Sequence, residues 1–182
     1  MQKTISYINS LGVEKILFFG VGIPIMFYDR IKGYKHGIDK YDVSSFPRSW
    51  VHPERRGDIQ SKNTKKKFDL IVINDSKHYK DLASYFKQSL KNLNEEGKIV
   101  ITHSMPKLPI HETTSPKPYQ SWCGQTREFV LELISKGGYK VTSYEYDLGV
   151  SVIEIDETKQ PKEIEIGIFE DWYFQRKELM SN

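Results

Sequence analysis

Three side chains suited to proton transfer, Asp75, His78 and His103, follow two strongly apolar segments, 70–73 and 98–102. An imidazole titrates near neutral pH and can act as a general base, and a carboxylate can orient an imidazole or an acceptor hydroxyl. These residue types at this position predict acid–base chemistry, with His103 or His78 as the candidate base and Asp75 as the orienting group. The pattern by itself leaves the reaction open.

A second interpretation of each histidine stays open. His78 stands where a helix begins and can be a helix cap, and His103 can be a loop residue with ordinary hydrogen bonds. His111 lies in a long connection and is a weaker candidate for the base.

The apolar segments must place these residues. Segment 70–73 is an uninterrupted aliphatic run, as expected of a parallel strand buried on both faces. Residues 81–94 have an amphipathic helical pattern, which Gly97 is expected to close in the left-handed conformation, and 98–102 follow as the next strand. In open α/β sheets, ligands bind at the carboxyl ends of strands where the strand order reverses.

The N-terminal part predicts a nucleotide-binding unit. A helix is expected at 4–11 and a strand at 15–19, followed by Gly20 and Gly22, a helix at 25–32 and a strand at 34–38. Glycines let the backbone approach a ligand, and Asp39, 19 positions after Gly20, suits a ribose diol. A tight turn at the glycines, and a cap or turn role for Asp39, remain alternatives.

The C-terminal part predicts a different arrangement. A long connection at 104–120 is followed by a helix at 125–135, two strands at 139–146 and 150–155 that pair as an antiparallel hairpin, and a helix at 169–179. Long loops in compact domains often cover a site, so Tyr119 and Trp122 are expected to contact an acceptor.

The composition indicates one globular domain spanning 1–182. The chain has 182 residues, is 38% hydrophobic and 28% charged, and has a net charge of +3. No apolar signal core or membrane-spanning run is present, and Cys123 is the only cysteine, so a soluble cytoplasmic protein is expected. The lysine run at 62–67 favours a solvated face over a nucleic-acid patch.

Several motifs together resemble the class I S-adenosylmethionine (SAM)-dependent methyltransferases. They are the strand-and-glycine segment 17–22, the acidic Asp39, the segment 57–59, and 68–75 with His78. Segments 97–106 and 146–150, Trp122, Gly124 and the tail 172–179 resemble a branch of small bacterial and viral enzymes associated with sugar and glycan modification.

This resemblance implies a Rossmann-like α/β sandwich with a mostly parallel seven-stranded sheet and a C-terminal antiparallel hairpin. It implies SAM as cofactor, and a sugar, glycan or other small-molecule hydroxyl as methyl acceptor. In such a reaction His103 or His78 would remove the hydroxyl proton, and Asp75 would orient the base or the acceptor. The implied cofactor-binding residues are Phe19, Gly20, Val21, Gly22, Asp39, Lys40, Asp58, Ile59 and Asn74. No nucleic-acid or membrane partner is expected, and the aromatic residues of the last helix leave a homodimer open.

Three positions depart from the family pattern. Phe18 stands where the family has an acid, Pro24 replaces a loop glycine, and Ser104 replaces an aspartate. Ser104 and Met105 are poor ligands for a hard cation, so no metal site is expected. The departures support an alternative function, a catalytically degenerate methyltransferase fold that acts as a binding or structural partner.

Overall fold

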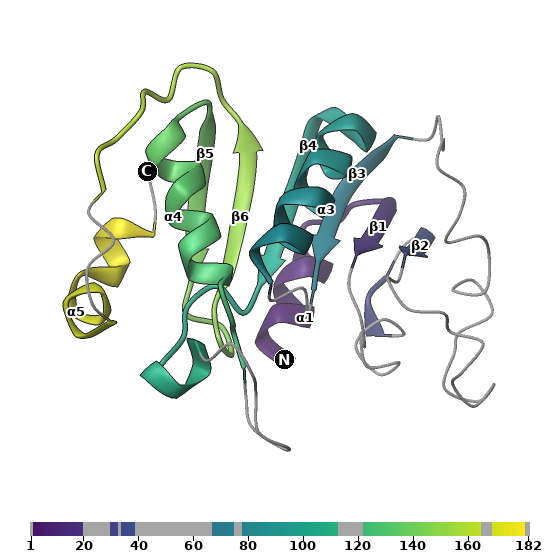
Figure 1. Cartoon of the computed structure of the whole chain (residues 1–182). Helices are drawn as coiled ribbons and strands as arrows, with labels where there is room; N and C mark the ends of the chain where they lie inside the picture. Colours follow the sequence, from purple (N-terminus) through teal and green to yellow (C-terminus); the bar gives the residue numbers. More distant parts are fainter. Residues whose placement is uncertain are drawn as a thin grey trace.

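The computed structural model describes residues 2–19, 30–32, 34–38 (backbone only), 67–74, 78–112, 122–164 and 169–180. The elements of these segments are, in chain order, α1 (Gln2–Ser10), β1 (Lys15–Phe19), β2 (Tyr34–Ile38), β3 (Phe68–Ile73), α3 (Tyr79–Asn92), β4 (Leu93–Thr102), the 3-10 helix η4 (Pro109–Glu112), α4 (Thr126–Lys136), β5 (Tyr139–Tyr144), β6 (Val150–Ile155) and α5 (Phe169–Leu179). Figure 1 shows their arrangement.

The strands form one mixed sheet in the order β2-β1-β3-β4-β6-β5. β2, β1, β3 and β4 are parallel to one another. β6 is antiparallel to β4, and β5 and β6 pair antiparallel from Tyr139–Ile155 to Tyr144–Val150. The chain moves outward from β1 to β2 and then returns to β3 on the other side, so the strand order reverses between β1 and β3.

The Rossmann-like α/β class is confirmed, but the predicted sheet is corrected in two respects. The described residues contain six strands and not seven. The antiparallel pair is also not the C-terminal element, because α5 follows it and buries Trp172 and Met180 in the core.

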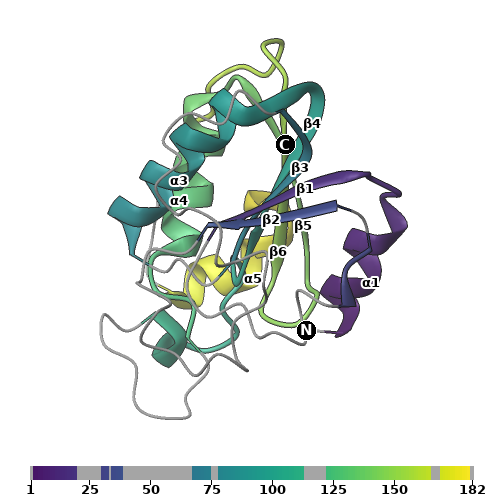
Figure 2. The same ribbon diagram turned by 90° about the vertical axis from the view of Figure 1, so that its right-hand side faces the viewer.

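Alternation along the strands divides the core between the two faces of the sheet. Leu17, Ile71 and Ile99 face the side that packs against α3, α4 and α5. Ile16, Phe18 and Val72 face the side that packs against Ile5 and Ile8 of α1. Figure 2 shows α1 on one side of the sheet and α3 and α4 on the other.

The junction of α3 and β4 differs from the prediction. The helix ends at Asn92 and the strand begins at Leu93, five residues earlier than expected, with an irregular register opposite Phe68–Leu70. Gly97 therefore lies in a strand and is not a left-handed helix cap. Glycine at position 97 allows the backbone to approach Leu93 closely, since a Cβ there would lie 2.7 Å from the Leu93 side chain.

The outer elements agree better with the prediction. β1, β2, β6 and α5 have the predicted bounds, and α1 and α4 begin within two residues of them. The long connection contains η4, which was not predicted. No helix among the described residues is long and apolar enough to cross a membrane.

Candidate functional site

The carboxyl ends of β1, β3 and β4 lie side by side at one edge of the sheet. Asn74, directly after β3, donates its backbone N–H to the Phe19 carbonyl at the end of β1, over 2.8 Å. The Phe19 side chain is turned away from this edge into the core, where it stacks on Tyr85 with ring centroids 5.0 Å apart. Phe19 therefore contributes only backbone to the edge, and Asn74 contributes its side chain.

A chain of side-chain hydrogen bonds joins Asn74 to His103. The buried Thr102 hydroxyl donates to Asn74 Oδ1 over 2.7 Å, and the same oxygen lies 3.0 Å from His103 Nδ1. A hydroxyl has one hydrogen, and Thr102 directs it at Asn74, so His103 must donate through Nδ1–H. In the neutral form of the ring, this arrangement leaves the lone pair on Nε2.

His103 also has an unusual backbone conformation. Its φ is +60°, a left-handed value that costs about 1 kcal/mol or more for a residue with a Cβ. Such conformations persist where the surrounding structure enforces them, and they are concentrated at functional sites. Here the conformation places the ring beside Thr102, at the point where β4 ends.

Ser104 has a packing role in this structure. It is fully buried and accepts a hydrogen bond of 2.8 Å from Ser151, whose oxygen lies 2.7 Å from Ser143. The backbone of the next residue, Met105, donates to the Leu148 carbonyl over 2.9 Å. A Cβ on Gly149 would lie 2.3 Å from the Met105 nitrogen, so this contact requires glycine at 149. The segment that carries His103 is therefore fastened to the β5–β6 turn.

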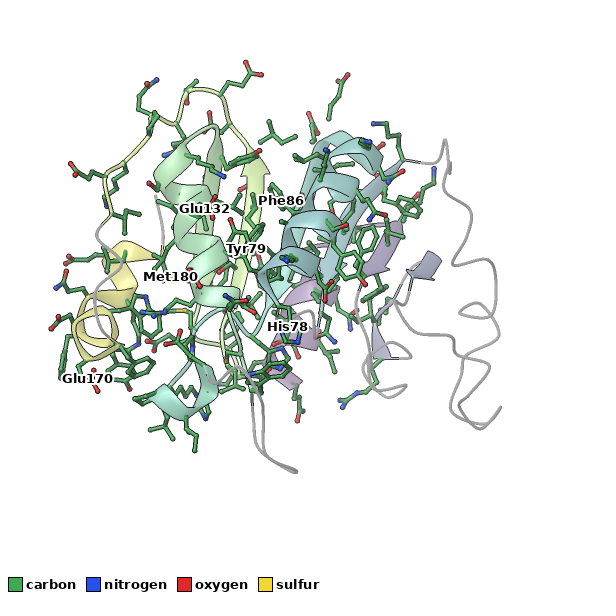
Figure 3. All side chains as sticks on the ribbon, in the orientation of Figure 1. His78, Tyr79, Phe86, Glu132, Glu170 and Met180 are labelled. Atoms are coloured by element: carbon green, nitrogen blue, oxygen red, sulfur yellow. The ribbon has the colours of Figure 1, made fainter. Side chains whose placement is uncertain are left out.

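His78 lies at the N-cap of α3 without a side-chain capping bond, so the capping alternative is not what its ring does here. The ring is exposed and meets Trp122 edge-on, with centroids 5.3 Å apart. The following residue, Tyr79, hydrogen-bonds to Glu132 of α4 (Figure 3). His78 thus follows the carboxyl end of β3, as His103 follows the carboxyl end of β4.

His111 has a structural environment. It is buried, its Nδ1 accepts the Lys107 N–H over 3.2 Å, and its carbonyl accepts the Cys123 N–H over 2.7 Å. Burial and, secondly, the Lys107 charge lower the pKa of His111. These contacts describe a structural role, in which the neutral ring of His111 binds Lys107 and its backbone carbonyl binds Cys123 and Gly124.

The predicted site residues divide into two groups. The first group lies within the described residues and consists of His103, His78, Asn74 and Phe19. The structure adds Thr102 to this group, which the sequence interpretation missed. The signal that could have indicated it is a polar residue at the end of an apolar strand. The remaining predicted residues lie outside the described residues: Asp75, Gly20, Val21, Gly22, Asp39, Lys40, Asp58 and Ile59. Within the described segments no group of three or more acidic, histidine or cysteine side chains could hold a metal ion.

Comparisons with known proteins agree on the fold. No protein-family model matches the sequence, and no curated protein is significantly similar to it. Among solved structures, the SAH-bound methyltransferase PaMTH1 of Podospora anserina matches with a TM-score of 0.55 and 16% identity, over 85% of this chain and 76% of that chain. The O-methyltransferase TomG of Streptomyces achromogenes, which is involved in tomaymycin synthesis and was solved with SAM, matches with a TM-score of 0.52 and 15% identity, over 85% and 80%. The chain thus has the Rossmann-like α/β fold of SAM-dependent O-methyltransferases.

Proposed function

We propose that the protein is a SAM-dependent methyltransferase that methylates a hydroxyl group of a sugar, a glycan or another small molecule. The observation that carries the proposal is the hydrogen-bonded chain from Asn74 through Thr102 to His103, at the carboxyl ends of β3 and β4 and beside the reversal of the strand order between β1 and β3. Ligands of open α/β sheets bind at this position. The solved proteins of similar fold include one bound to SAH and one bound to SAM.

The described residues fit the cofactor in one respect and depart from the family in another. Asn74 lies at the carboxyl edge, where its Oδ1 accepts the Thr102 hydroxyl and its amide group would be the donor to a ligand. Phe18, at the position of the family's acid, is fully buried beneath α1 and packs with Val72. Asn74 and the Phe19 backbone are the described groups that would hold SAM, and Phe18 would not help to hold its amine.

In this proposal His103 has the acid–base role. SAM, when bound, supplies an electrophilic methyl group on a sulfonium. His103 Nε2 would take the proton of the acceptor hydroxyl, while Nδ1 remains bonded to Thr102. Thr102 and Asn74 are positioning residues, since they act through the imidazole ring.

A binding test separates this function from the alternative. Calorimetric titration with SAM and with S-adenosylhomocysteine is expected to show binding and a raised melting temperature, because a ligand that binds only the folded state stabilises it. No heat and no stabilisation at millimolar ligand would instead support a degenerate fold that acts as a binding partner, the function that the buried Phe18 favours.

A turnover test addresses the base. The variant His103→Gln keeps a polar side chain but has no group that accepts a proton near neutral pH, so methyl transfer to a sugar hydroxyl should fall by about 100-fold. Unchanged turnover in His103→Gln would remove His103 from this role and leave His78 as the candidate.

We also propose a cytoplasmic homodimer, with contact through α5. The support for the compartment is the single cysteine, and the support for the dimer is Phe174, which is 84% exposed on α5. Light scattering of the wild type and of Phe174→Ser measures the mass, and a monomer in both would contradict the dimer.

A further inference from the structure

A groove of about 880 Å³ lies between α1 and the β5–β6 turn. Lys3, Ser6, Tyr7 and Ser10 line it from one stripe of α1, at the spacing that places side chains on the same helix face. The opposite stripe of α1, with Ile5 and Ile8, is buried on the sheet. Glu145, Tyr146, Asp147 and Lys107 complete the lining, together with Gln2.

The groove lies at the same edge of the sheet as His103. The N-terminal end of α1 lies at the side toward which the β3 arrow points (Figure 1). Thr4 holds it there, since its N–H and hydroxyl both donate to Asp147 Oδ2, over 3.3 and 2.6 Å. Lys107 lies four residues after His103, and the segment between them is bonded to the β5–β6 turn at Leu148 and Gly149. The groove wall at Lys107 thus belongs to the same chain segment as the candidate base His103, and the wall at the β5–β6 turn is hydrogen-bonded to that segment.

The two acidic residues of the groove are already engaged. Asp147 accepts both hydrogen bonds from Thr4, and Glu145 forms an ion pair of 2.7 Å with Arg176 of α5. Lys3 and Lys107 are exposed and have no ion-pair partner among the described residues. The cations of the groove are thus unpaired within the part of the chain that the structure describes, while its carboxylates are engaged by Thr4 and Arg176.

The groove also has an aromatic wall. Tyr7 packs against Tyr144 and Tyr146 with ring centroids 4.9 and 5.9 Å apart, and Tyr144 and Tyr146 stack at 5.2 Å with planes 7° apart. Burial and, next, the hydrogen bond with Tyr144 raise the pKa of Tyr7, so its ring stays neutral. Ring faces held in this way suit the apolar face of a sugar, and the serine hydroxyls around them suit its hydroxyl groups.

We propose that this groove binds an anionic saccharide, with the sugar against Tyr7 and Tyr146 and its carboxylate or phosphate on Lys3 and Lys107. This proposal rests on the proposed function, because it assigns the groove as the acceptor subsite of the same strand edge. A neutral sugar would leave two ammonium groups unused, whereas an acidic one forms charge-assisted hydrogen bonds with both.

The test is a set of binding titrations without SAM, at low ionic strength, because salt screens exposed charges. The probes are glucuronate, glucose 6-phosphate, glucose and inorganic phosphate. Glucuronate, glucose 6-phosphate or both should bind at least about tenfold more tightly than glucose and phosphate, and which of them binds identifies the anionic group. Equal affinity for glucose, equal affinity for phosphate alone, or no binding of either anionic sugar would overturn the proposal.

Variants test the assignment to this groove. The double variant Lys3→Gln/Lys107→Gln should weaken binding of the anionic sugar at least about tenfold, whereas Lys87→Gln/Lys162→Gln, which removes two exposed lysines elsewhere, should change it less than about twofold. Tyr146→Leu, with folding checked by circular dichroism, should weaken the binding of all the sugars. Unchanged affinity in the double variant would overturn the proposal.

Saccharide binding that persists when SAM does not bind would contradict only the proposed methyl transfer, so the two failures are distinguishable.

Discussion

Thr102 makes two contacts with one hydroxyl group, and this determines which nitrogen of His103 carries the proton. Thr102 is 6% exposed, and its hydroxyl donates to Asn74 and lies beside His103 Nδ1. The same arrangement makes Asn74 Oδ1 depend on Thr102, because a buried acceptor without a donor is costly. The Thr102 hydroxyl therefore determines both the tautomer of His103 and the hydrogen bond to Asn74.

Removing that hydroxyl tests the arrangement. Thr102→Val should lower the free energy of unfolding by about 1–3 kcal/mol and should lower methyl transfer through kcat, with a shifted pH profile, because the Asn74 oxygen loses its donor and the His103 ring its orientation. Thr102→Ser keeps the hydroxyl and is the matched control, expected to retain the wild-type pH profile. A stability loss with an unchanged pH profile would show that Thr102 serves folding alone.

The left-handed backbone of His103 gives a second prediction. His103→Ala and His103→Gly both remove the ring and its bond to Thr102, but only glycine adopts φ +60° without strain. His103→Gly should therefore be more stable than His103→Ala by about 1 kcal/mol in denaturant unfolding, with both variants inactive. Equal stability would mean that the chain relaxes out of this conformation once the ring is gone.

At the scale of elements, the segment after β4 is held together by η4 and its histidine. His111 joins Lys107 through its ring and Cys123 and Gly124 through its carbonyl. In the folded protein the pKa of His111 is lowered from 6.5 by burial and by Lys107. Between the folded and unfolded pKa values the unfolded chain binds more protons, so the free energy of unfolding falls as the pH drops below about 6.5.

This linkage predicts a difference between two proteins. The wild type should lose more stability than His111→Gln when the pH falls from 7 to 5, since the variant has no ring to protonate. Denaturant unfolding at several pH values measures the slopes, and the other titrating groups are common to both proteins. Parallel slopes would show that His111 does not contribute to the pH dependence.

The elements also show what the sequence can and cannot predict. β1, β2 and β6 were predicted with the observed bounds. In β1 and β6 the reason is a short apolar run, rich in β-branched or aromatic residues, for which few other structures are possible. The predicted boundary between α3 and β4 was wrong. Residues 94–97 have the local pattern of a helix end, but the pairing of Leu93 with Phe68 extends β4 back to Leu93. That pairing joins residues 25 positions apart, so local patterns do not contain it.

The candidate site shows the same division. His103, His78 and Asn74 could be found from the sequence because each follows or begins an apolar element at the strand edge. Thr102 could not be assigned, because its role depends on a contact with Asn74 across two strands. The groove beside α1 was not predicted either, since it joins Lys3 and Tyr7 to the distant residues Glu145, Tyr146 and Asp147.

At the scale of the whole molecule, different numbers of helices pack on the two faces of the sheet among the described residues. Three helices, α3, α4 and α5, pack on one face, and α1 is the helix that packs on the other among the described residues. Trp172 is 2% exposed in the first layer and Ile8 is 1% exposed in the second. Both layers share the strands β1, β3, β4 and β6, whose alternate side chains enter one or the other.

Because the strands are shared, the chain should unfold as one unit. Ile8→Ala should lower the free energy of unfolding by about 2–5 kcal/mol, and Trp172→Ala by about 3–5 kcal/mol, through loss of burial and the cavity left behind. In Ile8→Ala the midpoints from far-ultraviolet circular dichroism and from tryptophan fluorescence should shift together, since the sheet cannot lose one layer and keep the other. The surface variant Lys87→Gln, outside both layers, should leave both midpoints in place. Separated midpoints in Ile8→Ala would mean that α1 unfolds on its own, and that the 182-residue chain is not one cooperative domain.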